Sequence, residues 1–241
     1  MNTVKSIPLF YKAARNCLHF LLFFVISAFS LAWNDKSHGE ITKAAQNAID
    51  RGLEYLAKHQ NPDGSWSDVI GRKVNNYYIG KYGRHVGVSA LAGMAFLAGG
   101  YLPGRGKYGK TLKKLVDFFA DTFSKPENNP DGFISLNESR MYSHAFATLF
   151  LAEIYGMTHR PEIGTILRRS VKLIETSQNK HGGWRYLPGA KDSDLSIVVC
   201  QLMALRGARN AGIAVDPKVI QKAIDYVLKS YISYRAMNYQ Y

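Results

Sequence analysis

The segment QNPDGSW, residues 60–66, interrupts a helical pattern with four residues that favour a turn and then supplies a tryptophan. Its glycine, Gly64, is the residue type that most readily adopts the positive φ angle that ends a helix and reverses the chain. Before the segment, apolar residues from Ile41 to Leu56 recur every three or four positions, as on one face of a helix. The segment therefore predicts a helix, a tight turn and a bulky residue, Trp66, that packs behind the turn.

The same order of signals recurs twice further along the chain. NPDGF at 129–133 and KHGGW at 180–184 each follow a helical face, and Phe133 and Trp184 stand where the first copy has Trp66. We expect the turn glycines of these copies to have positive φ angles as well. Each turn then joins a helix to an apolar segment of helical length.

These apolar segments register with one another along the sequence. Leu97, Leu151 and Leu205 are each 54 residues apart. Self-similarity at a fixed period is the signature of repeat proteins, in which each helix pair buries its apolar face against its neighbours. The sequence predicts three helix pairs and the opening of a fourth near Val219, and because no strand-like alternation competes, the predicted fold class is all-α.

Two glutamines stand at the same distance from a tryptophan. Gln60 lies six residues before Trp66, and Gln178 lies six residues before Trp184. We expect each glutamine to bond free backbone groups at the end of a helix and to pack under the indole. Together with the glycines of the turns, Gly64 and Gly183, these residues are structural candidates.

The two copies resemble the QW motif of the prenyltransferase and squalene-oxidase repeat, which squalene-hopene cyclases and the β subunits of protein prenyltransferases share. The resemblance covers residues 42–230 and implies an α/α toroid, an inner ring of helices within an outer ring. A closed ring of this type takes about six helix pairs, and this chain offers about three and a half. We therefore expect an incomplete barrel or arc, which is either a truncated relative or an arc that a partner chain completes.

The stretch KDSDLS, residues 191–196, opens the third apolar segment. It is similar to the DxDDTA motif of squalene-hopene cyclases, which implies that Asp194 donates a proton to an alkene and that Asp192 tunes it. Leu195 replaces the third acid of that motif, and such a donor depends on its neighbouring acids. Helix capping explains both aspartates without catalysis, and substrate binding is a third interpretation.

Six further side chains are candidates for contact with a substrate at the mouth of the toroid. They are Trp184, Tyr186, Tyr142, Phe146, His144 and His85. Aromatic faces attract cations and stack on sugar rings, but they also fill cores, and a histidine at a helix start can cap it. The expected ligand is an isoprenoid or other lipid, or a polysaccharide.

No metal and no cofactor are expected. The zinc site of the protein prenyltransferases needs a cysteine soon after an aspartate and a later histidine, but Cys200 lies in an apolar segment and the last histidine is His181. The formal charge is +13, and the basic residues are spread over several helices. They form no dense stripe of the kind that binds nucleic acid, so a nucleic-acid partner is not expected.

Residues 1–32 have the features of a secretory signal peptide. Lys5, Lys12 and Arg15 precede an apolar run that ends in small residues at 30–32. Its removal takes away three basic residues and no acidic ones, so the charge falls from +13 to +10. We expect export to the periplasm or the extracellular space, with an uncleaved N-terminal membrane anchor as the alternative, and we expect an irregular tail over residues 231–241.

The sequence thus predicts an exported helical repeat protein that acts as a non-catalytic module for ligand binding or protein interaction. The alternative is a terpene-cyclase-like enzyme, an isomerase that uses Asp194 as its general acid. Both functions place the ligand where the inner helices begin.

Overall fold

The computed structural model describes residues 41–67, 83–127, 129–136, 139–233 and 236–237. The helices in these ranges are α2 (Lys43–Lys58), α3 (Val86–Ala98), α4 (Gly109–Phe123), α5 (Arg140–Ile154), α6 (Glu162–Ser177), α7 (Leu195–Asn210) and α8 (Pro217–Ser230). The predicted all-α class is confirmed. The proposed signal peptide, residues 1–32, lies outside the described residues, and no helix within them is long and apolar enough to cross a membrane.

The chain divides after Ala48. Residues 43–48 form the first turns of α2, and the description below concerns the second unit, Ile49–Tyr241.

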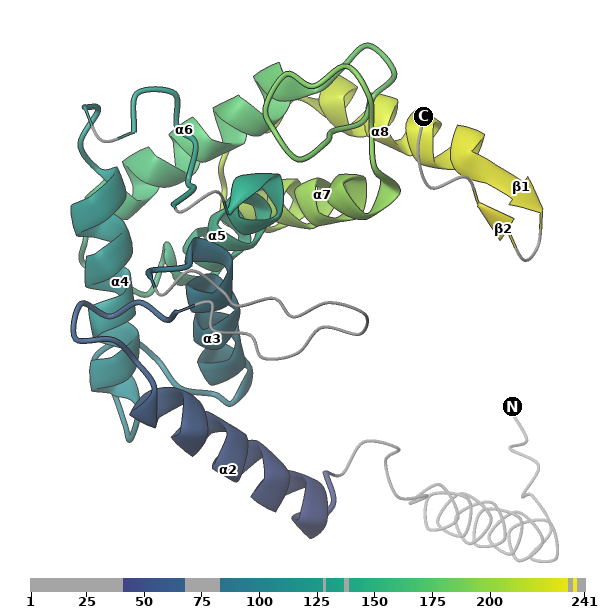
Figure 1. Ribbon diagram of the computed structural model, residues 1–241. Helices are drawn as coiled ribbons and strands as arrows, with labels where there is room; N and C mark the ends of the chain where they lie inside the picture. Colours follow the sequence, from purple (N-terminus) through teal and green to yellow (C-terminus); the bar gives the residue numbers. More distant parts are fainter. Residues whose placement is uncertain (1–40, 68–82, 128, 137–138, 234–235, 238–241) are drawn as a thin grey trace, which may run out of the picture. The chain divides into compact units, whose positions relative to one another are not determined.

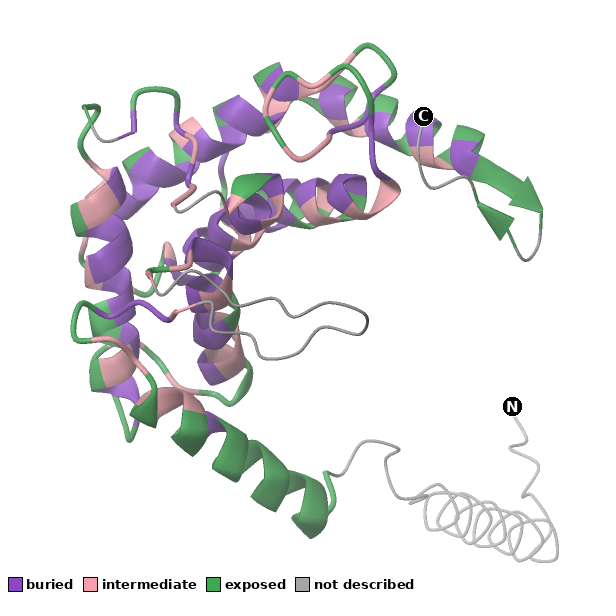
Figure 2. Cartoon of the chain, viewed as in Figure 1, coloured by how far each residue is buried: buried purple, intermediate pink, exposed green. Residues whose placement is uncertain are grey.

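Two kinds of helix alternate along this second unit. Helices α4, α6 and α8 are amphipathic and bury one apolar stripe, whereas α3, α5 and α7 are apolar on most of their surface. A helix that is apolar all round needs neighbours on several sides. In agreement, α5 packs between α3 and α7, and the amphipathic helices pack against these three as a second layer (Figures 1 and 2).

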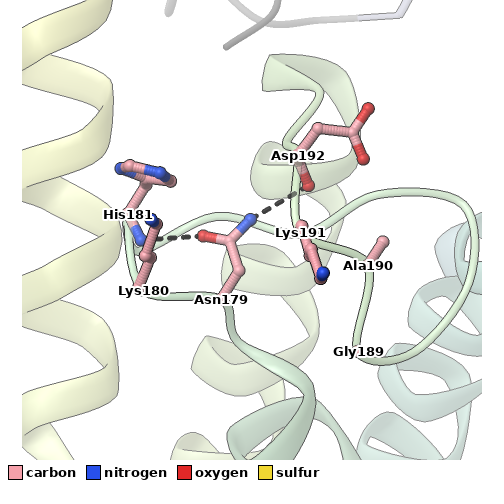
Figure 3. Close-up of a pocket in the computed structure, with 7 residues that line it drawn as sticks. All are labelled: Asn179, Lys180, His181, Gly189, Ala190, Lys191 and Asp192. Carbon is pink, nitrogen blue, oxygen red and sulfur yellow. Dashed lines mark hydrogen bonds between the residues drawn. The ribbon is translucent and has the colours of Figure 1, made fainter.

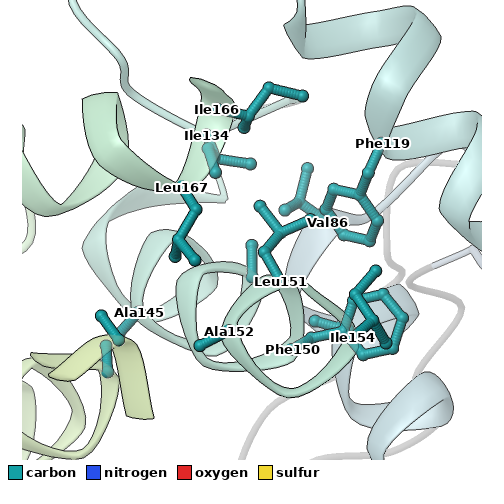
Figure 4. Packing of buried hydrophobic residues seen from close by; sticks show 14 of the residues in the cluster. Val86, Phe119, Ile134, Ala145, Phe150, Leu151, Ala152, Ile154, Ile166 and Leu167 are labelled. Carbon is teal, nitrogen blue, oxygen red and sulfur yellow. The ribbon is translucent and has the colours of Figure 1, made fainter. Parts of the chain in front are cut away.

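The core lies between the two layers (Figure 4). Phe119 of α4 and Phe150 of α5 are fully buried, with ring centroids 5.6 Å apart. The inner helices α3 and α5 approach closely at Gly87 of α3. A Cβ added there would lie 2.6 Å from Oγ of Ser143 in α5, so a larger residue would not fit. Burial of a phenylalanine in such a core contributes about 3–5 kcal/mol relative to alanine, so this layer contact holds the unit together.

The three turn glycines have positive φ angles, +94° at Gly64, +80° at Gly132 and +91° at Gly182. Each also lies against the backbone of the next amphipathic helix: a Cβ at these positions would collide with the carbonyl groups of Lys114 in α4, Arg169 in α6 and Lys222 in α8, respectively. Each turn therefore requires its glycine for two reasons, the positive φ angle and the close approach of the next amphipathic helix.

Gln60 and Gln178 join the first and third turns to the next amphipathic helix along the chain, α4 and α8, respectively. Nε2 of Gln60 donates to the carbonyl groups of Gly64 and Thr111, at 2.9 Å each. Nε2 of Gln178 donates in the same way to Gly182 and Val219, again at 2.9 Å. One amide thus satisfies a carbonyl of its own turn and a carbonyl in the first turns of α4 or α8.

The two tryptophans pack behind these turns. Nε1 of Trp66 donates to the carbonyl of Leu56 at 2.9 Å, and Nε1 of Trp184 donates to the carbonyl of Ile174 at 2.8 Å. Both side chains are buried. Each indole therefore bonds a carbonyl in the last turn of the preceding helix, where the regular bonds between residues four apart come to an end.

The middle turn differs from the expectation that Phe133 is its packing residue. Trp66 and Trp184 stand two residues after their turn glycines, and the residue two after Gly132 is Ile134. Ile134 is fully buried, whereas Phe133 is only half-buried. Phe133 does pack against the core, but the residue equivalent to the two tryptophans is Ile134, one position later.

The end of the chain also differs from the expected irregular tail. Strands β1 (Tyr231–Ser233) and β2 (Ala236–Met237) pair antiparallel, with Tyr231 opposite Met237. Both strands are exposed. Their aromatic and β-branched residues suit extended backbone, which a search for longer alternating patterns misses.

Candidate functional site

Asp194 is the N-cap of α7. Its Oδ1 accepts hydrogen bonds from the backbone N–H of Ser196 at 2.9 Å and from the Ser196 hydroxyl at 2.5 Å. Its Oδ2 accepts from the Tyr186 hydroxyl at 3.3 Å. The residue is only 1% exposed. Both carboxylate oxygens are therefore occupied as acceptors, which is the arrangement of a helix-capping side chain.

Asp192 has a different environment from Asp194. Its side chain is 56% exposed, and its Oδ2 lies 3.4 Å from Nε of Arg185. Nη1 of the same arginine lies 4.0 Å from Oδ2 of Asp194. Both carboxylates therefore lie within 4.0 Å of one guanidinium, which offsets one of their two negative charges.

Two tyrosines extend the cluster toward α5. The hydroxyl of Tyr142 bonds the Ser196 hydroxyl, and the Tyr142 and Tyr186 ring centroids lie 6.2 Å apart. A continuous chain of hydrogen bonds therefore runs from Tyr142 through Ser196 and Asp194 to Tyr186. The structure brings these candidate residues together where α5 and α7 begin.

Arginine side chains cover one member of this cluster. The guanidinium carbons of Arg185 and Arg140 lie 4.7 Å and 5.8 Å from the ring centroid of Tyr186. Arg140 opens α5 with a φ of +60°, the one positive value among non-glycine residues in the described ranges. The two arginines and Ser196 were not among the predicted site residues, because no motif links Arg140 with Tyr186, which is far along the chain, or Ser196 with Tyr142, and an arginine beside a tyrosine carries no signal of its own.

A depression of about 690 Å³ lies beside this cluster (Figure 3). Its lining consists of Asn179, Lys180, His181, Gly189, Ala190, Lys191 and Asp192. Asn179 connects two sides of the depression, because Nδ2 donates to the Asp192 carbonyl at 2.9 Å and Oδ1 accepts from the His181 N–H at 3.0 Å. The turn and the loop before α7 therefore form one connected surface, of which Asp192 is the only predicted site residue.

His144 was expected at the mouth as a substrate contact, and its position excludes that role. It is fully buried, its Nδ1 accepts from the N–H of Ile134 at 3.1 Å, and its Nε2 lies 3.1 Å from the Ser170 carbonyl. Since that carbonyl can only accept, the ring is neutral with its proton on Nε2. Burial lowers the pKa of His144 from 6.5 to about 4. The ring joins the middle turn, α5 and α6, and no surface of it remains for a ligand.

The other three candidates have separate environments. Trp184 is buried and bonded as described above, so it too has no surface for a substrate. His85 is the N-cap of α3, and its Nδ1 accepts from the N–H of Val88 at 3.1 Å. Phe146 is half-buried on α5, four residues after Tyr142 and therefore on the same face.

Cys200 lies on α7, close enough to Asp194 to feel its charge. Burial, and then the carboxylate of Asp194, raise the pKa of the Cys200 thiol above its ordinary value. The thiol therefore stays protonated and is a poor metal ligand. Among the residues that the structure describes, no group of three His, Cys, Asp or Glu side chains is placed to hold a metal ion.

The site thus combines the capping Asp194, an aromatic pair, two arginines and an apolar continuation along α5 and α7. Such a site can bind a group and orient it. Comparison of the sequence with protein-family models and with curated proteins finds no match.

Proposed function

We propose that this chain is a helical repeat module of the prenyltransferase and squalene-cyclase type, which binds an apolar ligand along its inner helices and does not protonate it. The exported location and the incomplete α/α toroid expected from the resemblance belong to this proposal. The ligand class is an isoprenoid or another lipid chain.

The turn geometry supports the repeat type. In the first and third copies, a glutamine of the turn bonds the next amphipathic helix, α4 or α8. An indole of the same turn bonds the helix before the turn, α2 or α6. The match includes partner atoms that lie 51 and 41 residues from Gln60 and Gln178, respectively. Two turns that make the same long-range hydrogen bonds are explained by a repeated structural unit, and chance explains them poorly.

The side chains of one face of the inner helices support an apolar ligand. Each of the inner helices α3, α5 and α7 has two nonpolar side chains, three positions apart and therefore on one face, that are not fully buried, and we group them in two rows. The rows are Leu91, Phe146 and Cys200, and Met94, Leu149 and Met203. Five of these six side chains are not aromatic, which favours an alkyl or isoprenoid chain over sugar rings that stack on aromatic faces.

The single observation that carries the non-catalytic assignment is the capping of α7 by Asp194. A general acid for an alkene must carry a proton and point it at the substrate. Here Oδ1 accepts two hydrogen bonds from Ser196 and Oδ2 accepts one from Tyr186, so both oxygens act as acceptors within the cap and neither points a proton at a substrate. The cyclase alternative requires this network to be rebuilt when the substrate binds.

Binding is tested with a fluorescent polyene fatty acid, displaced by squalene, and with paired variants. Leu91→Asp places a charge in the proposed ligand row, whereas Val199→Asp changes a residue that is equally exposed, at 47% in each case, but outside both rows. We expect the first variant to weaken binding by a factor of ten or more, about 1.4 kcal/mol, and the second to leave it unchanged. Equal effects of both variants contradict the proposal.

Catalysis is tested separately by incubation of the protein with squalene and shorter polyprenes. We expect no cyclised product from the unmodified chain. Product that is formed by the unmodified chain and lost in Asp194→Asn establishes the enzyme alternative instead.

A further inference from the structure

The third turn is closed in the same way as the first two turns but has a different composition. The sequence is Asn-Pro-Asp-Gly at 61–64 and at 129–132, but Asn-Lys-His-Gly at 179–182. In each copy the glycine N–H donates to the carbonyl of the asparagine, at 2.9, 3.4 and 3.0 Å, respectively, and the glycine has a positive φ angle. The turn therefore does not need a lysine or a histidine for its geometry.

The two replaced residues change the charge of the third turn. The first and second turns each carry an aspartate, whereas the third carries Lys180 and His181. Asp63 in the first turn accepts from the N–H and the hydroxyl of Ser65, at 3.0 and 2.7 Å. The side chains of Lys180 and His181 are exposed and make no hydrogen bond or ion pair within the described residues. No contact among those residues explains the basic pair, which is therefore available to a ligand.

The side chains of Lys180 and His181 line the depression of about 690 Å³ (Figure 3). Lys191 lines it from the loop before α7 and, like Lys180, has no ion-pair partner within the described ranges. The one acidic residue among the described lining residues is Asp192, and its Oδ2 lies 3.4 Å from Nε of Arg185. The depression therefore has basic side chains on two sides, and its volume lies in the usual range of small-ligand sites, about 300–1,000 Å³.

The frame of the depression is fixed by Asn179 and Gly182. Nδ2 of Asn179 donates to the Asp192 carbonyl at 2.9 Å and to the Ser193 hydroxyl at 2.7 Å, which ties the turn to the loop. A Cβ at Gly182 would lie 2.1 Å from the carbonyl oxygen of Lys222, so the turn is also packed tightly against α8. The two sides are therefore held together before a ligand binds, which lowers the entropic cost of binding.

The basic side chains of the lining favour a phosphate group over a carboxylate. Lysine binds phosphate as a compact point charge, whereas the planar fork of arginine matches a carboxylate with two hydrogen bonds. The described lining residues include three basic side chains and no arginine. A phosphate monoester carries about −1.5 to −2 charges at pH 7, which Lys180 and Lys191 balance. The depression is larger than a phosphate group, so it leaves room for the molecule that carries the phosphate.

We propose that the depression between the third turn and the loop at 185–193 binds a small phosphate ester, whose phosphate group is held by Lys180 and Lys191, with His181 as a further hydrogen-bond donor. The site is separate from the apolar rows of the proposed function and does not depend on them. Both lysines are exposed, and water weakens their attraction for an anion, so we expect weak binding that falls as the salt concentration rises.

The ligand class is tested by calorimetric titration of the full chain with glucose 6-phosphate, glucuronate and glucose. We expect the phosphate ester to bind at least about tenfold more tightly than glucose and more tightly than glucuronate, and to lose affinity at high salt. Equal binding of the ester and glucose overturns the proposal. So does tighter binding of glucuronate, because the site then selects a carboxylate.

The place of binding is tested with a variant that gives the third turn the sequence of the first two, Lys180→Pro/His181→Asp. The turn should keep its fold, since two copies in the chain have this sequence and no hydrogen bond of the described residues uses the Lys180 N–H. We expect its affinity for glucose 6-phosphate to fall by a factor of about ten or more. The matched control is Lys110→Gln/Lys114→Gln on α4, which lowers the formal charge by the same amount outside the lining and should keep the affinity.

Lys191→Gln removes the basic side chain of the loop, and it serves if the turn variant does not fold. We expect it to weaken binding of the ester about fivefold. Equal losses in the turn variant and the α4 control overturn the proposal, because the net charge and not the depression then attracts the phosphate. Unchanged affinity in Lys191→Gln overturns it as well. The polyene ligand of the proposed function should bind both variants as it binds the unmodified chain, so the two proposals fail independently.

Discussion

Nε2 of Gln178 lies 2.9 Å from the carbonyl oxygen of Val219, which connects the end of α6 with the first turns of α8, 41 residues later. The carbonyl belongs to the last of the described outer helices. This hydrogen bond therefore ties the start of α8 to the turn that precedes α7.

Removal of this tie is expected to destabilise α8. Gln178→Ala leaves the Val219 and Gly182 carbonyl groups without their shared donor and should lower the free energy of unfolding by about 1–3 kcal/mol. Urea unfolding measures the loss. Gln221→Ala is the control, because that glutamine bonds only Asp225 on the exposed surface of α8. Equal losses in the two variants would show that the bridge contributes nothing beyond a surface contact.

The turn glycines give a second prediction, with a control in the chain itself. Gly182 and Gly212 have φ angles of +91° and +83°, but only at Gly182 would a Cβ collide with another backbone group, the Lys222 carbonyl. Gly212→Ala should cost about 1 kcal/mol for the backbone angle alone. Gly182→Ala should cost at least about 2 kcal/mol more, because α8 must also move. Thermal unfolding of both variants compares the two costs, and equal values would argue against close approach as the reason for the glycine.

The two aspartates at the start of α7 are expected to differ in their contribution to stability. Asp194→Ala removes a buried cap and should lower the unfolding free energy by about 2 kcal/mol, whereas Asp194→Asn keeps an acceptor for the Ser196 N–H and should lose less. Asp192→Ala breaks an ion pair that is 56% exposed on the aspartate side and should lose about 0.5 kcal/mol or less. Chemical unfolding of the three variants tests this order. If Asp192→Ala is the most harmful, the exposed carboxylate and not the cap organises this end of α7.

The helices and turns could be predicted from the sequence because their signals are local. The spacing of apolar residues indicates where α3 and α7 begin, and a glycine after a polar break indicates a reversal. The site was harder to predict, because its contacts join residues that are far apart. Tyr142 and Ser196 are 54 residues apart, and nothing near either residue in the sequence indicates the other. His144 shows the same limit, since its acceptor Ser170 lies on the next helix.

The burial of His144 predicts a specific dependence of stability on pH. In the folded protein the pKa of His144 is about 4, below its ordinary value of 6.5, because burial disfavours the charged ring. The unfolded chain therefore binds a proton that the folded chain does not, at every pH between these two values. Stability that is fully present above the unfolded pKa is lost as the pH falls from about 6.5 toward 4, by about 2 kcal/mol between pH 7 and pH 5.

Urea unfolding of the unmodified chain and of His144→Gln at several pH values isolates this contribution, since other groups titrate equally in both proteins. The variant keeps one donor and one acceptor for Ser170 and Ile134, so its stability at neutral pH is lower but measurable. We expect the difference in unfolding free energy between the two proteins to shrink by about 2 kcal/mol as the pH falls from 7 to 5. A difference that stays constant over this range means that His144 is protonated equally in the folded and unfolded chains, and it contradicts the neutral ring between α5 and α6.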